Sequence, residues 1–294
     1  MHQDEPARRL AVLVVNYFSG DAVRSLLSSL HAEEGVRVEV VVVDNSCDED
    51  EAGRLRTVCA ESRLPIRLLI ADSNLGYGAG NDLAFRVARE SQPDVVLVAN
   101  PDTTVAEGSL RGLVEFALAH PRDLVSVTTL QNGARTSGLV RMSPVTGFPH
   151  DVATVPATLT RFTFPGGHFF AVSAERFARL GGFTDAYFLY CEELDLTLRN
   201  AAAGGGIAPY AGMTATHQGG LSINAGPDRS VTSFYHGTYS RVLLYRRYRA
   251  LRPYLPLLVV LRTGWGVSLV LIGQRRAGLA VLRALRNGLT ARRG

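Results

Sequence analysis

The sequence contains no lysine, so all 31 of its basic residues are arginines. We attribute this to a coding bias of the source genome, and it does not predict a nucleic-acid partner. Cysteine is also scarce: the chain has Cys47, Cys59 and Cys191, with no Cys-x-x-Cys spacing. The odd number and the spacing argue against a disulfide framework and against a zinc site. We therefore expect reduced thiols.

The N-terminus lacks the basic segment followed by an apolar segment that marks a secretory signal, so we expect a cytoplasmic protein. Long polar or low-complexity tracts are also absent from the sequence. With 46% hydrophobic and 20% charged residues in 294 positions, the chain has an ordinary globular composition. Apart from about eight N-terminal residues, we expect all of it to be folded.

Acidic residues are missing from Arg241 to the end, which makes residues 241–294 a basic tail. Within it, residues 255–273 are apolar and long enough to span a bilayer, but Arg262 lies near the middle. We expect an interfacial helix or a helical cap, whose flanking arginines would favour an anionic membrane surface. The alternative is that its apolar face packs on the rest of the chain or forms a homodimer interface.

Residues 10–120 alternate between apolar β-rich runs and amphipathic stretches. Strands are predicted at 10–16, 36–45, 66–71 and 94–100, and helices near 22–30, 49–60, 79–90 and 110–119. Four such units predict a parallel sheet covered on both faces. After residue 120 we expect short strands, a short helix ending at Gly181-Gly182 and a helix over 192–203, which complete one mixed domain.

Three polar residues, Asn16, Asp44 and Asp102, end predicted strands. Ligands of such sheets bind beyond the carboxyl ends of the strands, so these residues are expected in one crevice. Any one alone could be a turn or capping residue. The glycine loop Asn74–Asp82 reads Gly-x-Gly-x-Gly and follows the third strand, which disfavours a nicotinamide or flavin site.

Three carboxylates, Glu192, Glu193 and Asp195, open a predicted helix after an aromatic-rich segment. They could be solvated acids that favour the helix dipole, but their density favours a site where a carboxylate takes a proton from a bound hydroxyl. His217 follows a β-like run. It could be structural, or it could complete a divalent metal site.

Taken in order, the motifs resemble the family 2 glycosyltransferases with the GT-A fold, in particular the bacterial rhamnosyltransferase-like branch. The resemblance covers about residues 10–250 and is carried by these stretches: "VVNYFSG", "VVVDNSC", "NLGYGAGND", "LVANPDT", "GGFTDAYFLYCEELDLTLR" and "HQGGLS".

The resemblance implies an α/β fold with a GT-A type, Rossmann-like mixed sheet flanked by helices and a C-terminal helical extension. The implied domains are a GT-A catalytic domain, 1–240, and the tail, 241–294. The catalytic domain would have a nucleotide-sugar half at about 10–120 and an acceptor half at about 121–240.

The donor site is also implied by the resemblance. Asp44 would accept from N3-H of a uracil or thymine ring. Asp102 would bind Mg2+ or Mn2+ bridging the diphosphate, with His217 as a further ligand. The residues implied to bind the nucleotide sugar are Asn16, Tyr17, Asp44, Asn74, Gly76, Gly80, Asn81, Asn100 and Asp102.

For an inverting transfer, the resemblance makes Glu193 the base, while Glu192 and Asp195 orient the acceptor or brace the helix. Glu193 stands where the family usually has Asp, so the choice between Glu192 and Glu193 stays open. His168 and Tyr190 are placed on the acceptor side, with a packing role as the alternative for His168. Asn100-Pro101-Asp102 replaces the usual Asp-x-Asp, which removes one carboxylate.

The implied function is transfer of L-rhamnose or a related deoxysugar from a dTDP- or UDP-sugar to a hydroxyl of a glycan, lipid-linked or small-molecule acceptor. Cell-envelope glycan or natural-product synthesis would be the setting, in the cytoplasm or peripherally on the inner face of the membrane. A nucleotidyltransferase is one alternative, but "NYFSGDAV" lacks its basic glycine-rich phosphate loop. The other is a non-catalytic glycan-binding protein on a degenerate transferase fold.

Overall fold

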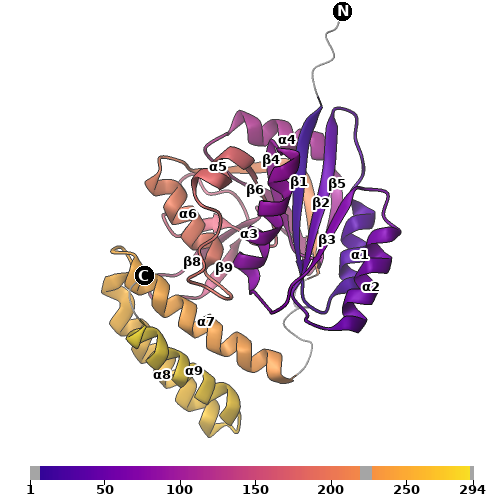
Figure 1. Cartoon of the computed structure of the whole chain (residues 1–294). Helices are drawn as coiled ribbons and strands as arrows, with labels where there is room; N and C mark the ends of the chain where they lie inside the picture. Colours follow the sequence, from indigo (N-terminus) through magenta and orange to yellow (C-terminus); the bar gives the residue numbers. More distant parts are fainter. Residues whose placement is uncertain (1–6, 219–226, 292–294) are drawn as a thin grey trace, which may run out of the picture.

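The computed structural model describes residues 7–218 and 227–291, and Figure 1 shows the path of the chain through them. The expectation of about eight unfolded N-terminal residues falls almost entirely outside the described residues, and the first strand begins at Arg8. Most of the "HQGGLS" motif also lies outside them.

A mixed sheet of nine strands forms the centre of the molecule. The predicted parallel units are confirmed: β3 (Ile66–Ile70), β2 (Val36–Asp44), β1 (Arg8–Asn16) and β4 (Val95–Ala99) lie side by side and run parallel. The sheet continues from β4 through β11 (Phe169–Ser173), β6 (Leu124–Gln131), β12 (Ile207–His217) and β5 (Thr103–Gly108), and β7 (Ala134–Thr136) pairs with β6. Since β11 is antiparallel to both of its neighbours, the sheet as a whole is mixed.

Helices cover both faces of this sheet because its central strands carry apolar side chains on both sides. The side chains of Leu10, Val12 and Val14 pack under α1 (Gly20–Ser29), α2 (Glu49–Ala60) and α4 (Leu110–Ala119). Those of Ala11 and Leu13 face the layer of α3 (Tyr77–Ala88), α5 (Ala174–Arg179) and α6 (Glu192–Ala202). Successive residues of a strand point to opposite faces, so one run supplies both cores.

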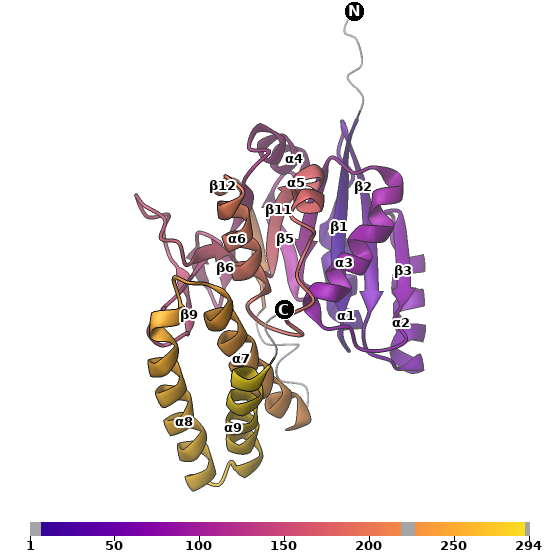
Figure 2. The same ribbon diagram turned by 60° about the vertical axis from the view of Figure 1, so that its left-hand side comes forward.

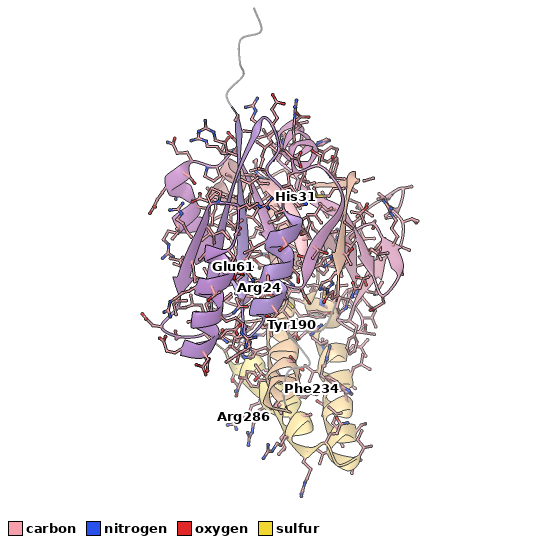
Figure 3. The ribbon with its side chains drawn as sticks, turned by 90° about the vertical axis from the view of Figure 1, so that its right-hand side faces the viewer. Arg24, His31, Glu61, Tyr190, Phe234 and Arg286 are labelled. Carbon is pink, nitrogen blue, oxygen red and sulfur yellow. The ribbon has the colours of Figure 1, made fainter. Side chains whose placement is uncertain are left out.

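Side-chain caps fix where several of these helices start. Asp48 accepts from the N3 backbone of α2, Ser109 caps α4 and Ser173 caps α5. Each satisfies a backbone N–H that has no partner within its helix. Figure 3 views the molecule from the side of α1 and α2, where an ion pair between Arg24 and Glu61 joins the two helices.

Strand β5 is a feature that the alternation of strands and helices did not predict. It follows β4 after one tight turn and pairs antiparallel with β12, which is more than 100 residues later in the chain. Its residues, "TTVAEG", include few apolar side chains because it lies at the edge of the sheet. Partners so distant in sequence leave no local signal.

The second half of the chain adds a small sheet and a helical layer. Strands β9 (Pro149–Val152), β8 (Leu139–Met142) and β10 (Thr163–Pro165) form a three-stranded antiparallel sheet. Figure 2 shows α7 (Pro227–Arg247), α8 (Leu255–Leu271) and α9 (Arg275–Thr290) as a helical layer that extends beyond the sheet. The expected domain boundary at residue 240 lies inside α7.

The helical layer packs on the rest of the chain through a core of its own. Tyr187, in the segment before α6, and Leu194 of α6 lie in this core together with Val242 and Tyr245 of α7. Leu258 of α8 and Leu285 of α9 complete it. The C-terminal helices are therefore continuous with the layer that carries the predicted carboxylates.

Helix α8 also has an exposed side. With the short 3-10 helix Arg252–Tyr254, it forms the one helix in the described part of the chain that is long and apolar enough to cross a membrane, and only 22% of its most apolar window is buried. Arg262, in contrast, is 3% exposed and faces inward.

Candidate active site

A cavity of about 680 Å³ lies where the ends of β1 and β4 meet α3, the start of α6 and one side of α7. Most of the predicted site residues line it, and these are Tyr17, Asn74, Gly76, Asn100, Asp102, His168, Tyr190, Glu192, Glu193 and His217. The others do not line it, and these are Asn16, Asp44, Gly80, Asn81 and Asp195. A volume of this size suits a small-molecule site.

Asn16 and Asp44 form a fully buried polar network at the ends of β1 and β2. Their strands pair in register with Asn16 opposite Asp44, and Asn16 Nδ2 donates to Asp44 Oδ1 at 3.0 Å. Glu51 Oε1 also accepts from this amide, at 3.1 Å, and Ser46 Oγ donates to Asp44 Oδ1 at 2.6 Å. Within the described residues, Asp44 Oδ2 has no hydrogen-bond partner. A buried carboxylate oxygen without a partner is unusual in a folded protein, although Asp44 lies outside the lining of the cavity.

The turn after β4 positions Asp102 beside His217. Thr103 N donates to Asn100 O at 3.1 Å, which closes the turn, and the antiparallel register of β5 and β12 places His217 opposite Thr103. His217 Nε2 consequently lies 3.4 Å from Asp102 Oδ2. Asp102 Oδ1 and His217 Nδ1 are buried and, among the residues described, unpartnered. The pair therefore offers one carboxylate and one imidazole to a ligand.

Asp102 and His217 fit the donor set of a divalent cation in type but not in number. In residues 7–218 and 227–291 there is no group of three or more His, Cys, Asp or Glu side chains that could hold a metal ion. A cation that prefers oxygen ligands can draw the remainder from phosphate oxygens and water. The unsatisfied Asp102 oxygen is the observation that favours such a ligand.

His168 supports this pair from behind. Its ring stacks on that of His217, with centroids 4.4 Å apart and planes 6° apart, and its Nε2 is 2.9 Å from Thr129 Oγ1. Burial, with a smaller effect of His217, lowers the pKa of His168 to about 3, so its imidazole is neutral. Its backbone carbonyl accepts from Asn100 N at 2.8 Å, which ties it to the same turn.

Glu192 and Glu193 open α6, and both have raised pKa values. Burial raises the pKa of Glu193 to about 7, and burial together with the neighbouring Glu193 charge raises that of Glu192 well above its usual range. The N-terminus of a helix favours carboxylate charge, but here desolvation is the larger effect. Glu192 is 1% exposed and Glu193 is half-buried, so Glu193 is the more accessible of the two.

Backbone features on either side hold Glu193 in place. A Cβ atom at Gly167 would overlap the Glu193 carboxyl group, so any larger residue there would require the Glu193 side chain to move. The Tyr77 hydroxyl donates to Gly167 O at 2.6 Å and so holds the backbone at Gly167. Just before α6, Tyr190 and Cys191 both adopt left-handed φ values, 72° and 77°. Such strain in non-glycine residues is concentrated at functional sites.

Asp195 points away from the cavity. It is fully buried, and Arg199 Nε donates to its Oδ2 at 2.7 Å. The hydroxyls of Tyr187 and Tyr248 donate to its Oδ1 at 3.3 and 2.7 Å, and Arg247 Nε lies 3.5 Å away. These contacts fit the bracing role that the sequence left open for Asp195, because they join α6 to the end of α7.

The glycine loop makes its close contacts with protein atoms. Gly76 has φ +81°, and a Cβ there would overlap the Phe188 carbonyl oxygen. Gly80 lets α3 approach Val15 of β1, and Asn81 Nδ2 bonds back to Tyr77 O at 3.0 Å. The loop therefore packs the segment before α6 against α3, whereas the resemblance had implied that Gly76, Gly80 and Asn81 bind the nucleotide sugar.

Several contributors to the cavity were not predicted. Helix α7 supplies part of the wall through Ser233, His236 and Arg241, and the segment before α6 adds Phe188, whose ring lies 4.6 Å from that of His236. Figure 3 shows Tyr190 at the junction between the sheet and the C-terminal helices. Ser233 and His236 belong to no motif that predicts a site. Phe188 is one residue of the aromatic-rich segment and Arg241 was interpreted only as part of the basic tail, so nothing in their spacing signals a cavity wall.

Solved structures share this architecture. GalNAc-T7 crystallised with UDP, GalNAc and Mn2+ matches with a TM-score of 0.64 at 13% identity, over 86% of this chain and 50% of that one. The mannosyltransferase PcManGT from Pyrobaculum calidifontis, in complex with GDP-Man and Mn2+, has a TM-score of 0.57 at 16% identity, over 98% and 88%. These likenesses and the cavity at the strand ends define a GT-A type glycosyltransferase fold.

The sequence then places the chain within that class. Residues 11–190 match the model of glycosyl transferase family 2, which is more than half of the chain, and the protein belongs to this family. It is a glycosyltransferase with rhamnosyltransferase-like relatives, as the motifs indicated. Family membership does not support the nucleotidyltransferase or the non-catalytic binding protein.

The curated relatives are distant. An N-acetylglucosaminyl-diphospho-decaprenol L-rhamnosyltransferase of Mycobacterium tuberculosis is 26% identical over 258 residues, covering 78% of this chain and 82% of the relative. Rhamnosyltransferase WbbL of Escherichia coli is 22% identical, covering 66% and 77%. The low-salt glycan biosynthesis hexosyltransferase Agl10 of Haloferax volcanii is 27% identical over 65% of this chain, which spans only 61% of that relative's length.

Proposed function

We propose that this glycosyltransferase is an inverting, divalent-metal-dependent enzyme that transfers L-rhamnose or a related deoxysugar from a dTDP- or UDP-sugar to an acceptor hydroxyl. The observation that carries the proposal is that one cavity joins the Asp102–His217 pair to Glu193, whose pKa is raised to about 7. The rhamnosyltransferase names of two relatives support the choice of sugar.

Recognition of the donor's nucleobase is assigned to Asp44. Its Oδ1 is held by Asn16 and Ser46, while Oδ2 has no partner within the described residues and can accept from N3-H of uracil or thymine. Tyr17, Asn74 and Asn100 line the adjoining wall of the cavity. Both pyrimidines carry this N–H, so the acceptor oxygen favours dTDP and UDP over nucleotides that lack it.

A divalent cation, Mg2+ or Mn2+, would be held by Asp102, with His217 as a further ligand. When bound, it supplies Lewis-acid stabilisation for the diphosphate that departs. Mn2+ accompanies the nucleotide in two structural neighbours, which supports this assignment. His168 is assigned the role of positioning the His217 ring, since the two rings stack.

Removal of the proton from the acceptor hydroxyl is assigned to Glu193. As the acceptor oxygen bonds to the anomeric carbon and the bond from that carbon to the diphosphate oxygen breaks, the hydroxyl proton passes to the Glu193 carboxylate. Attack opposite the leaving group inverts the configuration. A carboxyl with a pKa near neutrality is matched to this task. Glu192, more deeply buried, and Tyr190 on the same wall orient the acceptor.

The protein is proposed to act in the cytoplasm, peripherally on the inner face of the membrane. Exposed apolar residues recur at helical spacing along one side of α8, and these are Leu257, Val260, Leu261, Val267 and Leu271. The chain has no acidic residue after Asp228, so this side faces anionic lipid without repulsion. A lipid-linked glycan acceptor would suit such a location, whereas soluble glycans or small molecules would not need it.

Vesicle sedimentation tests the membrane contact. The wild type should pellet with anionic phosphatidylglycerol vesicles more than with phosphatidylcholine vesicles, and replacing Val260 and Leu261 with serine should abolish this. The other outcome is that the protein does not bind vesicles and forms a stable dimer, which the same substitutions dissociate. This side of α8 would then be a homodimer interface.

Titration calorimetry tests the donor site first. We expect dTDP or UDP to bind wild-type protein more tightly with Mn2+ than without it, and Asp102→Ala to lose the metal-dependent part. Asp151→Ala, an exposed carboxylate on β9, is the matched control and should bind as the wild type does. If neither nucleotide binds under any condition, the donor assignment is wrong.

A further inference from the structure

Arg262 is a buried arginine without a carboxylate. It lies in the middle of the apolar helix α8, and its side chain is only 3% exposed. Its Nε and Nη2 are buried and find no hydrogen-bond acceptor in the part of the chain that is described. No ion pair with an acidic side chain is recorded for it among those residues. Guanidinium groups this deeply buried are normally paired.

The surroundings of Arg262 add positive charge and aromatic rings. Its Cζ lies 4.3 Å from the centroid of the Phe148 ring and 5.1 Å from that of Trp265. Arg241 of α7 approaches the same Phe148 ring, with Cζ 5.8 Å from its centroid. Burial, with a smaller effect of Arg241, lowers the pKa of Arg262 to about 10, so the Arg262 guanidinium stays charged near neutral pH.

This arrangement is unfavourable for the fold alone. Aromatic faces attract cations, but they replace only part of the hydration that a buried guanidinium loses. Two neighbouring cations repel each other as well. An apolar side chain at position 262 would fill the same space without either cost, so the arginine is better explained by a ligand than by stability.

Arg241 connects this pair to the cavity. It lines the cavity wall, and its Cζ lies 6.0 Å from the centroid of the Tyr190 ring. Its Nε donates to Gly147 O at 2.5 Å and its Nη1 donates to Gly237 O, so the group is held in place. Both arginines lie beyond residues 11–190, the part that matches the family model, and they therefore belong to a feature that this model does not describe.

We propose that Arg241 and Arg262 form a binding site for a phosphate-class anion that is reached from the cavity at Arg241, since Arg262 itself does not line the cavity. Guanidinium groups bind phosphate oxygens through paired N–H donors, which suits phosphate better than a single point charge would. The proposal rests on the proposed function in one respect: the anion would be part of an acceptor whose hydroxyl reaches Glu193. The same chemistry could come from the headgroup of a membrane lipid, and the test separates the two sources.

Inorganic diphosphate is the probe, and calorimetry in EDTA keeps it from binding through a divalent cation. We expect the wild type to bind it, and Arg262→Met to bind it about tenfold more weakly or worse, because charge-assisted hydrogen bonds are lost. Arg249→Met removes the same charge from an exposed position of the tail and should leave binding unchanged. Arg241→Lys, which keeps the charge but not the planar donors, should also weaken binding.

Vesicle sedimentation separates the sources. If Arg262→Met loses diphosphate binding but still pellets with phosphatidylglycerol vesicles, the anion belongs to a small phosphorylated ligand. If diphosphate does not bind but vesicle binding depends on Arg262 and not on Arg249, the phosphate belongs to a lipid headgroup. If neither measurement distinguishes Arg262→Met from Arg249→Met, the proposal is overturned.

Thermal unfolding and donor binding complete the test. Arg262→Met should melt at the same temperature as the wild type or higher, whereas a marked loss of stability together with unchanged diphosphate binding would assign Arg262 a packing role. Binding of UDP with Mn2+ should be the same in both proteins. Failure of the donor site would abolish UDP binding in the wild type itself, so the two proposals fail separately.

Discussion

The Tyr248 hydroxyl donates a 2.7 Å hydrogen bond to Oδ1 of the fully buried Asp195, and so joins the end of α7 to α6. Arg199 and Arg247 approach the same carboxylate. The helix that begins with Glu192 and Glu193 is thereby fixed to the C-terminal layer on the side away from the cavity. Positioning of the proposed base thus depends on a residue more than 50 positions later in the chain.

Removing the Tyr248 hydroxyl should weaken the contact between α6 and the end of α7. We expect Tyr248→Phe to lower the free energy of unfolding by about 1–3 kcal/mol, because it deletes a buried hydrogen bond to a charged group. Urea unfolding measures this. The control is Tyr254→Phe, since no hydrogen bond of its hydroxyl is recorded within the described residues. Equal effects of the two substitutions would show that the contact with Asp195 contributes nothing.

Replacing the proposed base should abolish transfer while leaving the donor bound. Glu193→Gln should reduce kcat by about 100-fold or more, with dTDP or UDP affinity unchanged. Glu192→Gln should reduce it less, because that carboxyl is more deeply buried and its pKa is raised well above its usual range, which makes it a poorer base. If Glu192→Gln proves the more damaging, the roles of the two residues are exchanged.

The pH dependence of wild-type activity follows from the raised pKa of Glu193, about 7. A base must be deprotonated, so kcat/KM should fall about tenfold for each unit of pH below that value and level off above it. A profile that is flat between pH 5 and 8 would contradict the assignment.

Stability should change with pH in the opposite direction. The folded-state pKa of Glu193 lies above its ordinary value of 4.5, so its contribution is fully present below about pH 4.5 and is lost as pH rises through about 7. Glu193→Gln removes this loss and should be more stable than the wild type at pH 8, by about 1–3 kcal/mol. Urea midpoints at pH 5 and 8 measure it. Glu175→Gln, on the exposed side of α5, should behave as the wild type at both values.

The close approach of Gly167 to Glu193 gives an independent test of the base. Gly167→Ala places a methyl group where Glu193 Oε1 lies, so the carboxylate must move and transfer should fall by about tenfold or more. Gly53→Ala in α2, where nothing lies within 4 Å of the new Cβ, should leave activity unchanged and raise helix stability slightly. Full activity of Gly167→Ala would show that Glu193 has room to reposition.

The parallel half of the fold was predictable because each of its strands is a continuous apolar run followed by a helix with regular spacing. Strand β5 was not, since it is polar and pairs with a strand far along the chain. The three carboxylates at the start of α6 illustrate a second limit of prediction from the sequence. Asp195 lies two residues after Glu193, which is about 200° around a helix, so the two point to opposite sides. Their density alone had grouped them in one site.

The donor and acceptor ends of the predicted site depend on different features of the fold. Residues that end parallel strands lie at one edge of the sheet, so Asn16, Asp44 and Asp102 could be predicted at that edge, but only Asp102 lines the cavity. The acceptor end depends on how α7 packs across α6, through Tyr187, Val242 and other apolar contacts. Such packing between helices leaves no signature in the spacing of polar residues.

The neighbourhood of Asp102 and His217 depends on the backbone ladder between β5 and β12, in which His217 lies opposite Thr103. Side chains alternate between the two faces of a strand. Deleting one residue near the irregularity at Thr214 and Ala215 would therefore turn the His217 imidazole to the opposite face, although Asp102 and His217 would both still be in the sequence. A homologue that keeps both residues but has a different strand length would thus have lost the pair, and conservation of letters alone would not reveal it.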